Sequence, residues 1–191
     1  AYLHPNWFDP VDDIRSRYGI DPHRQLAVVR QISWEAVHDV GHSGFDCLET
    51  LVDELEADDV QVLITSEGDL PPHFEPYQVT VPPEEIHDLL YHADVLIGES
   101  GTMTLESAVL GTPAVFAASF SAGVLTELES EYGLVCVPDN EDRTVGAVDC
   151  AKRLLRTDQS VWDRRRQRLL DDKIDTTAFI RDEVQALEHA V

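Results

Sequence analysis

The chain has 191 residues, 43% of them hydrophobic, which is the size and composition of one globular domain with a sizeable core. No apolar run in it approaches the roughly 20 residues that a membrane span needs. Its 14 basic and 37 acidic residues give a net charge of −23, which argues against the concentrated basic surface that nucleic-acid binding requires.

The order of elements along the chain predicts an α/β fold. Residues 1–10 contain two Xaa-Pro turns and are expected to be a linker entering the domain. Short runs rich in β-branched residues then recur, as expected for strands buried on both faces of a sheet. We expect six strands, at residues 26–31, 60–65, 77–81, 94–97, 113–117 and 134–137.

Helical patterns separate these runs, with apolar residues spaced three and four apart. We expect helices at residues 45–57, 83–92, 102–110 and 123–132, the last ended by Gly133, and a helical region from 141 to 191 with breaks near 157–158 and 172–175. Strands that alternate with helices predict one doubly wound, mostly parallel, Rossmann-like sheet of about six strands over residues 1–191.

The segment from Asp94 to Phe116 is the strongest candidate for a ligand site. A buried strand ends at Gly98, a turn follows, and a helix begins near Thr102. In an open parallel sheet ligands bind at the carboxyl ends of the strands, and a helix N-terminus there suits a phosphate. Gly98 and Gly101 would let the backbone approach the anion, and Ser100 and Thr102 would add hydroxyl donors. The alternative is a plain turn in which Ser100 or Thr102 caps the helix.

Glu106 follows Thr102 by about one helical turn. A carboxylate there would repel a diphosphate, so its useful role is to accept hydrogen bonds from ribose hydroxyls. The alternative is an acidic residue that complements the helix dipole.

The pattern Ser-Gly-Thr-x-x-x-Glu-x-x-x-x-Gly-x-Pro, residues 100–113, resembles the C-terminal domain of GT-B nucleotide-sugar proteins such as UDP-GlcNAc 2-epimerase and related glycosyltransferases. In that group the Ser-Gly turn grips the diphosphate and the Glu holds the ribose. The resemblance therefore implies diphosphate contacts at Ser100, Gly101 and Thr102 and ribose contacts at Glu106. It also places the base against the loop that contains Val81.

Residues 28–45, VVRQISWEAVHDVGHSGF, are similar to a stretch of the uncharacterised family called domain of unknown function 354, whose C-terminal half is also GT-B-like. That resemblance implies an N-terminal domain that is missing from this chain and carries the acceptor site or part of the catalytic site.

The loop after the first strand supplies further candidates. Arg30 is expected to neutralise the diphosphate and Ser33 to contact the ligand, while His38 is a candidate catalytic acid or base. A surface loop with no ligand role stays open as the alternative. The spacing of His38, Asp39 and His42 also admits a metal site, but nearby glycines disfavour the helix that it needs, and we expect no metal.

Two compositional features bear on the environment of the protein. Self-repulsion at −23 destabilises a compact domain, and about 1 M salt shortens the Debye length to about 3 Å, so the acidic surface predicts a halophile. An acidic face for a basic partner is the alternative. Three widely spaced cysteines are expected to be core thiols, and the start of the chain, which has no signal-like pattern, predicts a cytoplasmic protein.

Together these features predict the donor half of a GT-B-type glycosyltransferase or UDP-sugar epimerase, which binds a UDP-sugar, requires no further cofactor and is inactive alone. The alternatives are a non-catalytic binding module of the same fold and a metal-assisted hydrolase. The arginines at 164–166 and 168 are expected to pair with nearby carboxylates, and a homodimer stays open.

Overall fold

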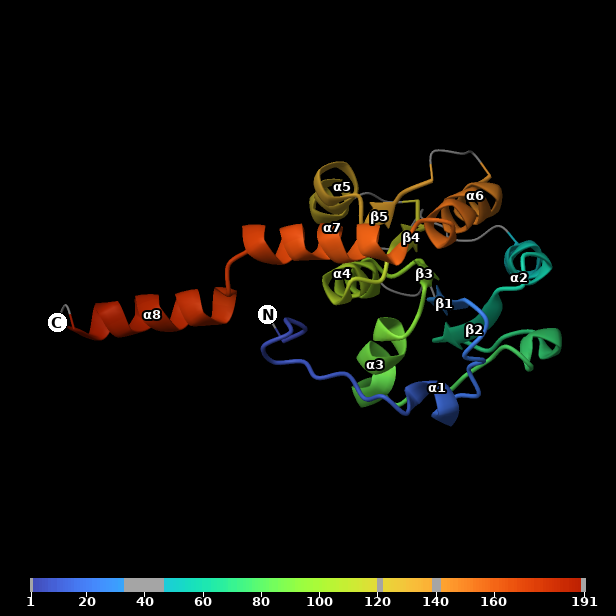
Figure 1. Ribbon diagram of the computed structural model, residues 1–191, viewed down its shortest axis with the longest axis horizontal. Coiled ribbons are helices and arrows are strands. Elements are labelled where there is room, and N and C mark those ends of the chain that lie inside the picture. Colours follow the sequence, from blue (N-terminus) through green and yellow to red (C-terminus); the bar gives the residue numbers. More distant parts are fainter. Residues whose placement is uncertain (1, 33–46, 120–121, 139–141, 190–191) are drawn as a thin grey trace.

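Five parallel strands form a single sheet in the computed structural model, which describes residues 2–32, 47–119, 122–138 and 142–189 (Figure 1). The strand order is β2-β1-β3-β4-β5. The strands are β1 (Leu26–Gln31), β2 (Gln61–Ser66), β3 (Val95–Gly98), β4 (Ala114–Phe116) and β5 (Val135–Cys136). The doubly wound parallel sheet is therefore confirmed, with five strands in place of about six.

Residues 77–81, expected as a sixth strand, form only a single bridge to β2. The Ile64 N–H donates to the Tyr77 carbonyl at 2.8 Å, and the Val79 N–H donates to the Ile64 carbonyl at 2.9 Å. Prolines stand directly before and after this run, and a proline has no N–H with which to extend a ladder. The run therefore lies beside the sheet edge without becoming a strand.

The expected helices are present in order, and α1 (Ile14–Arg17) is an additional short helix that was not expected. The others are α2 (Leu48–Ala57), α3 (Ile86–Tyr91), α4 (Gly101–Leu110), α5 (Gly123–Glu127), α6 (Arg143–Leu155), α7 (Gln159–Asp172) and α8 (Thr176–His189), with 3-10 turns η2 (Pro72–Phe74) and η3 (Pro83–Glu85) and the π-helical turn η4 (Leu128–Tyr132). The C-terminal region is helical with both expected breaks, and α8 extends away from the rest of the molecule (Figure 1). Gly133 ends η4 with a φ of 64°, as predicted.

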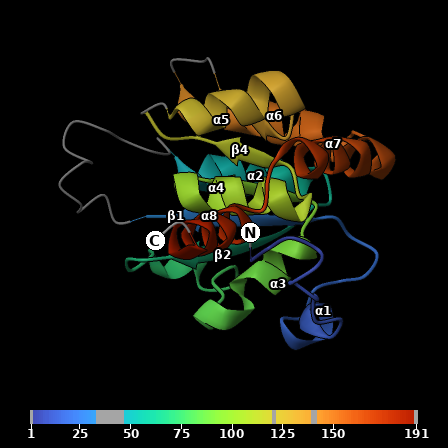
Figure 2. The same cartoon turned by 90° about the vertical axis from the view of Figure 1, so that its left-hand side faces the viewer.

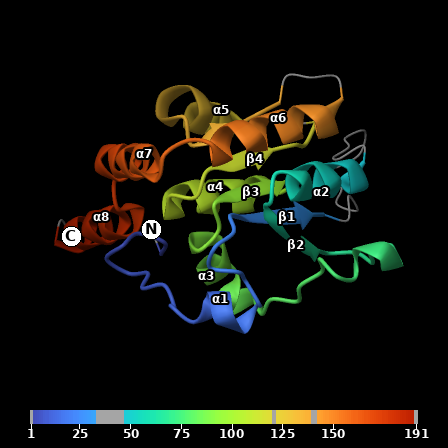
Figure 3. The same ribbon diagram turned by 45° about the vertical axis from the view of Figure 1, so that its right-hand side comes forward.

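The sheet is covered on both faces, which explains why the buried residues of its strands are mostly apolar. Ala27 and Val29 of β1 pack in one cluster with α2 and α6, whereas Leu26 and Val28 pack in a second cluster with α1 and α3. All four side chains are fully buried. Figure 3 shows α6 and the pair of α1 and α3 on opposite sides of the sheet.

The N-terminal segment, expected as a linker, lies against α3 and α4. Leu3 is buried, the Phe8 ring lies 6.3 Å from that of Tyr91, and the Val11 N–H donates to Asp88 Oδ1 at 2.8 Å. Figure 2 shows the start of the chain between α3 and α4. Residues near the start of the chain are thereby brought into contact with the site described below.

The arginine run on α7 mostly binds backbone carbonyls, so the expected pairing with carboxylates is wrong for most of it. Helix C-termini leave carbonyls unpaired and carry partial negative charge, which suits a guanidinium. The bonds are Arg165 to Gly133 O at 2.7 Å, Arg166 Nε to Val109 O at 3.0 Å and Arg168 to Glu131 O at 3.0 Å. Arg168 also lies 3.8 Å from Asp172, the one carboxylate partner of this run within the described residues.

Gly111 ends α4 in the left-handed conformation, with a φ of 96°. Its N–H donates to Ala108 O at 3.1 Å, and the next N–H, of Thr112, donates to Ser107 O at 3.0 Å. A Cβ at position 111 would stand 2.7 Å from Arg166 Cδ. Both the backbone angle and the packed arginine therefore require glycine here.

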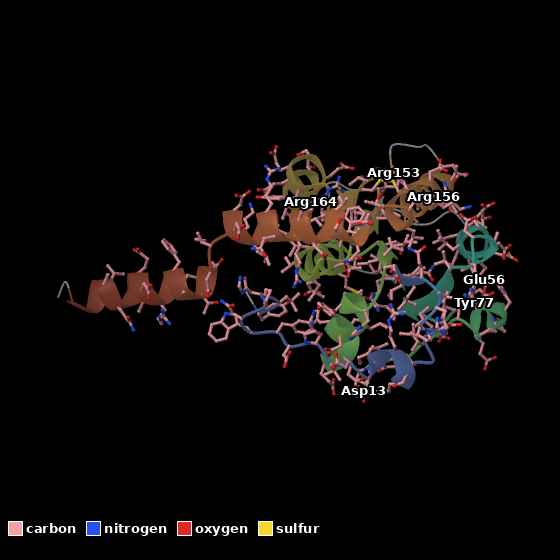
Figure 4. All side chains as sticks on the ribbon, viewed as in Figure 1. Asp13, Glu56, Tyr77, Arg153, Arg156 and Arg164 are labelled. Carbon is pink, nitrogen blue, oxygen red and sulfur yellow. A yellow bond between two sulfur atoms is a disulfide. The ribbon has the colours of Figure 1, made fainter. Side chains whose placement is uncertain are left out.

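Two of the three cysteines form a disulfide, so the expectation of core thiols is wrong for them. Cys136 of β5 and Cys150 of α6 are joined, 14 residues apart in sequence, and α6 packs against β3 and β4 of the same sheet. Arg153 of α6 lies beside this bond, with Nη2 2.8 Å from Cys136 Sγ (Figure 4). Cys47 is exposed and has a free thiol, and a hydrogen bond from the Thr50 hydroxyl lowers the pKa of that thiol.

Denatured, unreduced protein is therefore expected to show one reactive thiol per chain with Ellman's reagent, and three after treatment with dithiothreitol. Closing a loop of this length contributes about 3 kcal/mol through the unfolded state, so reduction should lower the free energy of unfolding by that order. Cys47→Ser is the matched control, since it removes a thiol and leaves the disulfide. Three reactive thiols without reductant would contradict the pairing.

Candidate functional site

The carboxyl ends of β1 and β3 form the edge where the predicted ligand residues meet. The strand order places β1 and β3 side by side, with the chain connections running outward from them in opposite directions. Arg30 of β1 lies in register with Gly98 of β3. This is the switch point of a doubly wound sheet, the position at which such sheets bind ligands.

The turn after β3 leads directly into α4. Ser100 is the N-cap, and its hydroxyl accepts from the Met103 N–H at 3.4 Å. The Thr104 hydroxyl and N–H both donate to the Ser100 carbonyl, at 2.9 and 3.0 Å. These bonds hold the turn in one shape, so the capping role of Ser100 is confirmed, and it is compatible with a ligand contact.

Three backbone N–H groups remain available at this turn. Within the described residues, the N–H groups of Ser100, Gly101 and Thr102 have no hydrogen-bond acceptor. They belong to the start of a ten-residue helix, whose dipole places positive potential there. The arrangement can therefore bind an anion without a cationic side chain.

Of the two glycines of the turn, only Gly98 is required by packing. A Cβ at Gly98 would meet Arg30 Cβ at 3.2 Å, so Gly98 is required by close packing against the neighbouring strand. A Cβ at Gly101 would lie 3.7 Å from Leu125 Cδ1, an ordinary contact, so that position accepts a methyl group. Neither glycine has a positive φ.

Arg30 forms an ion pair at the strand end. Its Nη2 lies 2.5 Å from Glu67 Oε1, and one fifth of its side chain is exposed. Its Nε is buried and has no hydrogen-bond partner among the described residues. To contact a diphosphate as predicted while keeping this ion pair, Arg30 would have to bind Glu67 and the ligand at the same time.

Glu99 is a buried carboxylate that the sequence reasoning did not single out. It is 1% exposed, and its Oε2 accepts a hydrogen bond from the Ile32 N–H at 3.1 Å. It thus joins the end of β3 to the chain that leaves β1. Its position directly after a buried strand was the one feature of the sequence that could have indicated a buried carboxylate here.

Glu106 lies in the middle of α4, where two side chains from other elements reach it. The Tyr2 hydroxyl donates to its Oε1 at 2.5 Å, and His87 Nε2 of α3 lies 3.2 Å from its Oε2. The hydrogen bond to Glu106 is the main reason that the pKa of Tyr2 is raised to about 12. The sequence reasoning missed both Tyr2 and His87, which lie far from Glu106 in the chain.

Val81 packs against the same core cluster as residues of α3 and α4. It is half-buried in the cluster that contains Met103 of α4 and Ile86 of α3. Pro82 and Pro83 then begin η3, as expected of prolines at a helix start. The loop predicted to face the base therefore packs on a core cluster to which α4, the helix that carries Glu106, also contributes.

Several predicted residues lie outside the described part of the chain. Ser33, His38, Asp39 and His42 all fall between residues 33 and 46, so the catalytic and metal hypotheses for them stay predictions. Within the described ranges no three His, Cys, Asp or Glu side chains are arranged to hold a metal ion. No described helix combines the length and apolar character of a membrane span.

The fold is shared with solved glycosyltransferases and with an epimerase. The glycosyltransferase VinC in complex with DTDP is similar at a TM-score of 0.60 and 18% identity, over 95% of this chain and 45% of that one. The calicheamicin glycosyltransferase CalG4 has a TM-score of 0.52 and 18% identity, over 96% and 45%. Methanocaldococcus jannaschii UDP-GlcNAc 2-epimerase, solved with UDP-GlcNAc and UDP, has a TM-score of 0.51 and 11% identity, over 78% and 43%.

These likenesses establish a GT-B-like fold, and the chain spans under half the length of the structures it matches. Comparison with curated protein sequences gives no match. The family model described as "Protein of unknown function (DUF354)" matches residues 19–177, which is most of the chain. The chain therefore belongs to the DUF354 family.

Proposed function

We propose that this chain is the donor half of a GT-B-type glycosyltransferase or UDP-sugar epimerase, and that it binds a nucleotide-diphosphate sugar at the carboxyl edge of β1 and β3. A UDP-sugar is the ligand that we expect, with an N-terminal domain outside this chain supplying the acceptor side. The unpaired N–H groups of Ser100, Gly101 and Thr102 carry this proposal.

The chemistry of a diphosphate leaving group fits those donors. A transferred or epimerised sugar leaves negative charge on the diphosphate, and preorganised N–H groups stabilise developing charge without reorganisation. The net charge of −23 makes backbone donors especially suitable, because they attract an anion without needing a cationic cluster. Arg30 stands on the adjacent strand, where it would add one positive charge.

The nucleoside part would extend from the turn along α4. Glu106 lies on the same helix as the turn, and Val81 packs on a core cluster to which this helix also contributes. A diphosphate at the N-terminus of α4 would thus carry its ribose toward Glu106 and its base toward residues 80–84.

Replacing Gly101 by proline tests the proposal directly. Proline removes the N–H and suits the first helical position, and Ser100 already has the extended ψ of 113° that a residue before proline prefers. We expect calorimetric titration in molar KCl to show UDP and pyrophosphate each binding about tenfold more weakly, because one hydrogen bond to a charged group is lost.

Gly101→Ala is the matched control, since it adds a Cβ in the space beside Leu125 and keeps the N–H. Its binding should equal that of the unchanged protein. Equal losses in both variants would show that bulk at position 101 matters and the N–H does not. Failure of UDP, UDP-GlcNAc and pyrophosphate to bind the unchanged chain at millimolar concentration would refute the proposed function.

A further inference from the structure

The two carboxylate oxygens of Glu106 have different neighbours. Oε1 accepts a hydrogen bond from the Tyr2 hydroxyl at 2.5 Å, and Oε2 lies 3.2 Å from His87 Nε2. The glutamate side chain is only 13% exposed. The two oxygens of this mostly buried carboxylate therefore face different elements, the N-terminal segment and α3.

His87 belongs to α3, and its ring packs against the N-terminal segment. Its ring has edge contacts with the rings of Tyr2 and Phe8, at centroid distances of 5.7 and 6.5 Å, and its side chain is 22% exposed. Nε2 is buried, and within the described residues it has no aligned hydrogen-bond partner, although Glu106 Oε2 is within reach. A buried polar atom left in this state is costly unless a partner becomes available.

The Tyr2 hydroxyl shows what Oε1 accepts. It is a phenolic O–H donor, and it belongs to an exposed side chain of the N-terminal segment. A ribose hydroxyl offers the same donor to the same oxygen. The Tyr2 hydroxyl therefore offers Oε1 the same kind of donor as the proposed ligand would.

We propose that His87 is the positioning residue that sets Glu106 for the ribose and thereby the preference for a ribonucleotide. This rests on the proposed function. When a ribose hydroxyl replaces the Tyr2 hydroxyl at Oε1, the carboxylate turns enough for His87 Nε2–H to donate to Oε2. The carboxylate is then fixed from one side and binds the ligand on the other.

Two substitutions at position 87 test this against a merely structural role. His87→Leu fills the space and removes the donor, whereas His87→Gln places an amide N–H at a similar reach. In calorimetric titrations we expect UDP to bind about tenfold more weakly to the Leu variant and within a few-fold of normal to the Gln variant. Pyrophosphate, which reaches only the turn before α4, should bind all three proteins equally.

The sugar preference gives the second readout. The unchanged protein should bind UDP about tenfold more tightly than 2′-deoxy-UDP, because one hydrogen bond to a charged group is lost. His87→Leu should lose most of that preference, and Tyr2→Phe, which removes the competing hydroxyl, should bind UDP more tightly than the unchanged protein.

The outcomes separate the two proposals. Normal UDP binding and normal ribose preference in His87→Leu would overturn the role of His87 and leave the proposed function standing. Weaker binding of pyrophosphate along with UDP in His87→Leu, or no recovery in His87→Gln, would also overturn it, since packing alone would then explain the loss. If UDP binds neither the unchanged protein nor the Tyr2→Phe variant, both proposals are refuted.

Discussion

Glu106→Gln is expected to weaken UDP binding about a hundredfold and to leave pyrophosphate binding unchanged. A ribose presents two adjacent hydroxyls to the carboxylate. Glutamine replaces one acceptor oxygen by an NH2 group that cannot accept, and the bond to its remaining oxygen is no longer charge-assisted, so one hydrogen bond is lost and the other is weakened. The substitution keeps the volume of the side chain and removes its charge. Calorimetric titration of the two ligands in molar KCl measures both affinities.

Glu75→Gln is the control for the general loss of one acidic charge, because Glu75 is exposed and lies beside η2. It should bind both ligands normally. If Glu106→Gln binds UDP as well as the unchanged chain does, Glu106 does not hold the ribose. Parallel losses for UDP and pyrophosphate would instead indicate damage to α4.

Low salt is expected to unfold part of the domain. Even if each of the 14 basic residues neutralised one of the 37 acidic residues, 37 − 14 = 23 carboxylates would remain uncompensated. One basic side chain already pairs with two carboxylates, since Lys152 Nζ lies 2.8 Å from Glu54 Oε2 and 3.4 Å from Asp58 Oδ2. Circular dichroism should show full helical signal in molar KCl and partial loss in dilute buffer, because salt shortens the range of the repulsion.

Sucrose distinguishes screening from a general stabilisation of compact states. It favours burial through its exclusion from the protein surface but carries no charge. Dilute buffer with sucrose should therefore restore less of the signal than choline chloride at the ionic strength of the KCl sample. A spectrum that is the same at all salt concentrations would contradict the prediction of a halophile's protein.

The fold was largely predictable because strands covered on both faces leave a strong signal. Runs such as residues 26–29 are apolar and fully buried, and the helices between them show regular spacing. The error at residues 77–81 has a local cause, since flanking prolines prevent a ladder that the β-branched composition favours. The disulfide depends on how α6 folds back against β5, which spacing alone does not reveal.

The candidate site was predictable only where it is continuous in sequence. The turn before α4 contains its own cap and donors, so Ser100, Gly101 and Thr102 were accessible to local reasoning. The surroundings of Glu106 could not be predicted in this way, because Tyr2 belongs to the N-terminal segment and His87 to a different helix. Arg30 was correctly placed at the edge, but its partner Glu67 comes from the chain after β2.

The contact between Gly111 and Arg166 constrains how this family can vary. The arginine holds the carbonyl end of α4 only because position 111 leaves room for its side chain. A larger residue at 111 would displace the guanidinium and leave the Val109 carbonyl without its donor. The two positions are therefore expected to change together among related sequences, so that a shorter residue at 166 accompanies any loss of the glycine.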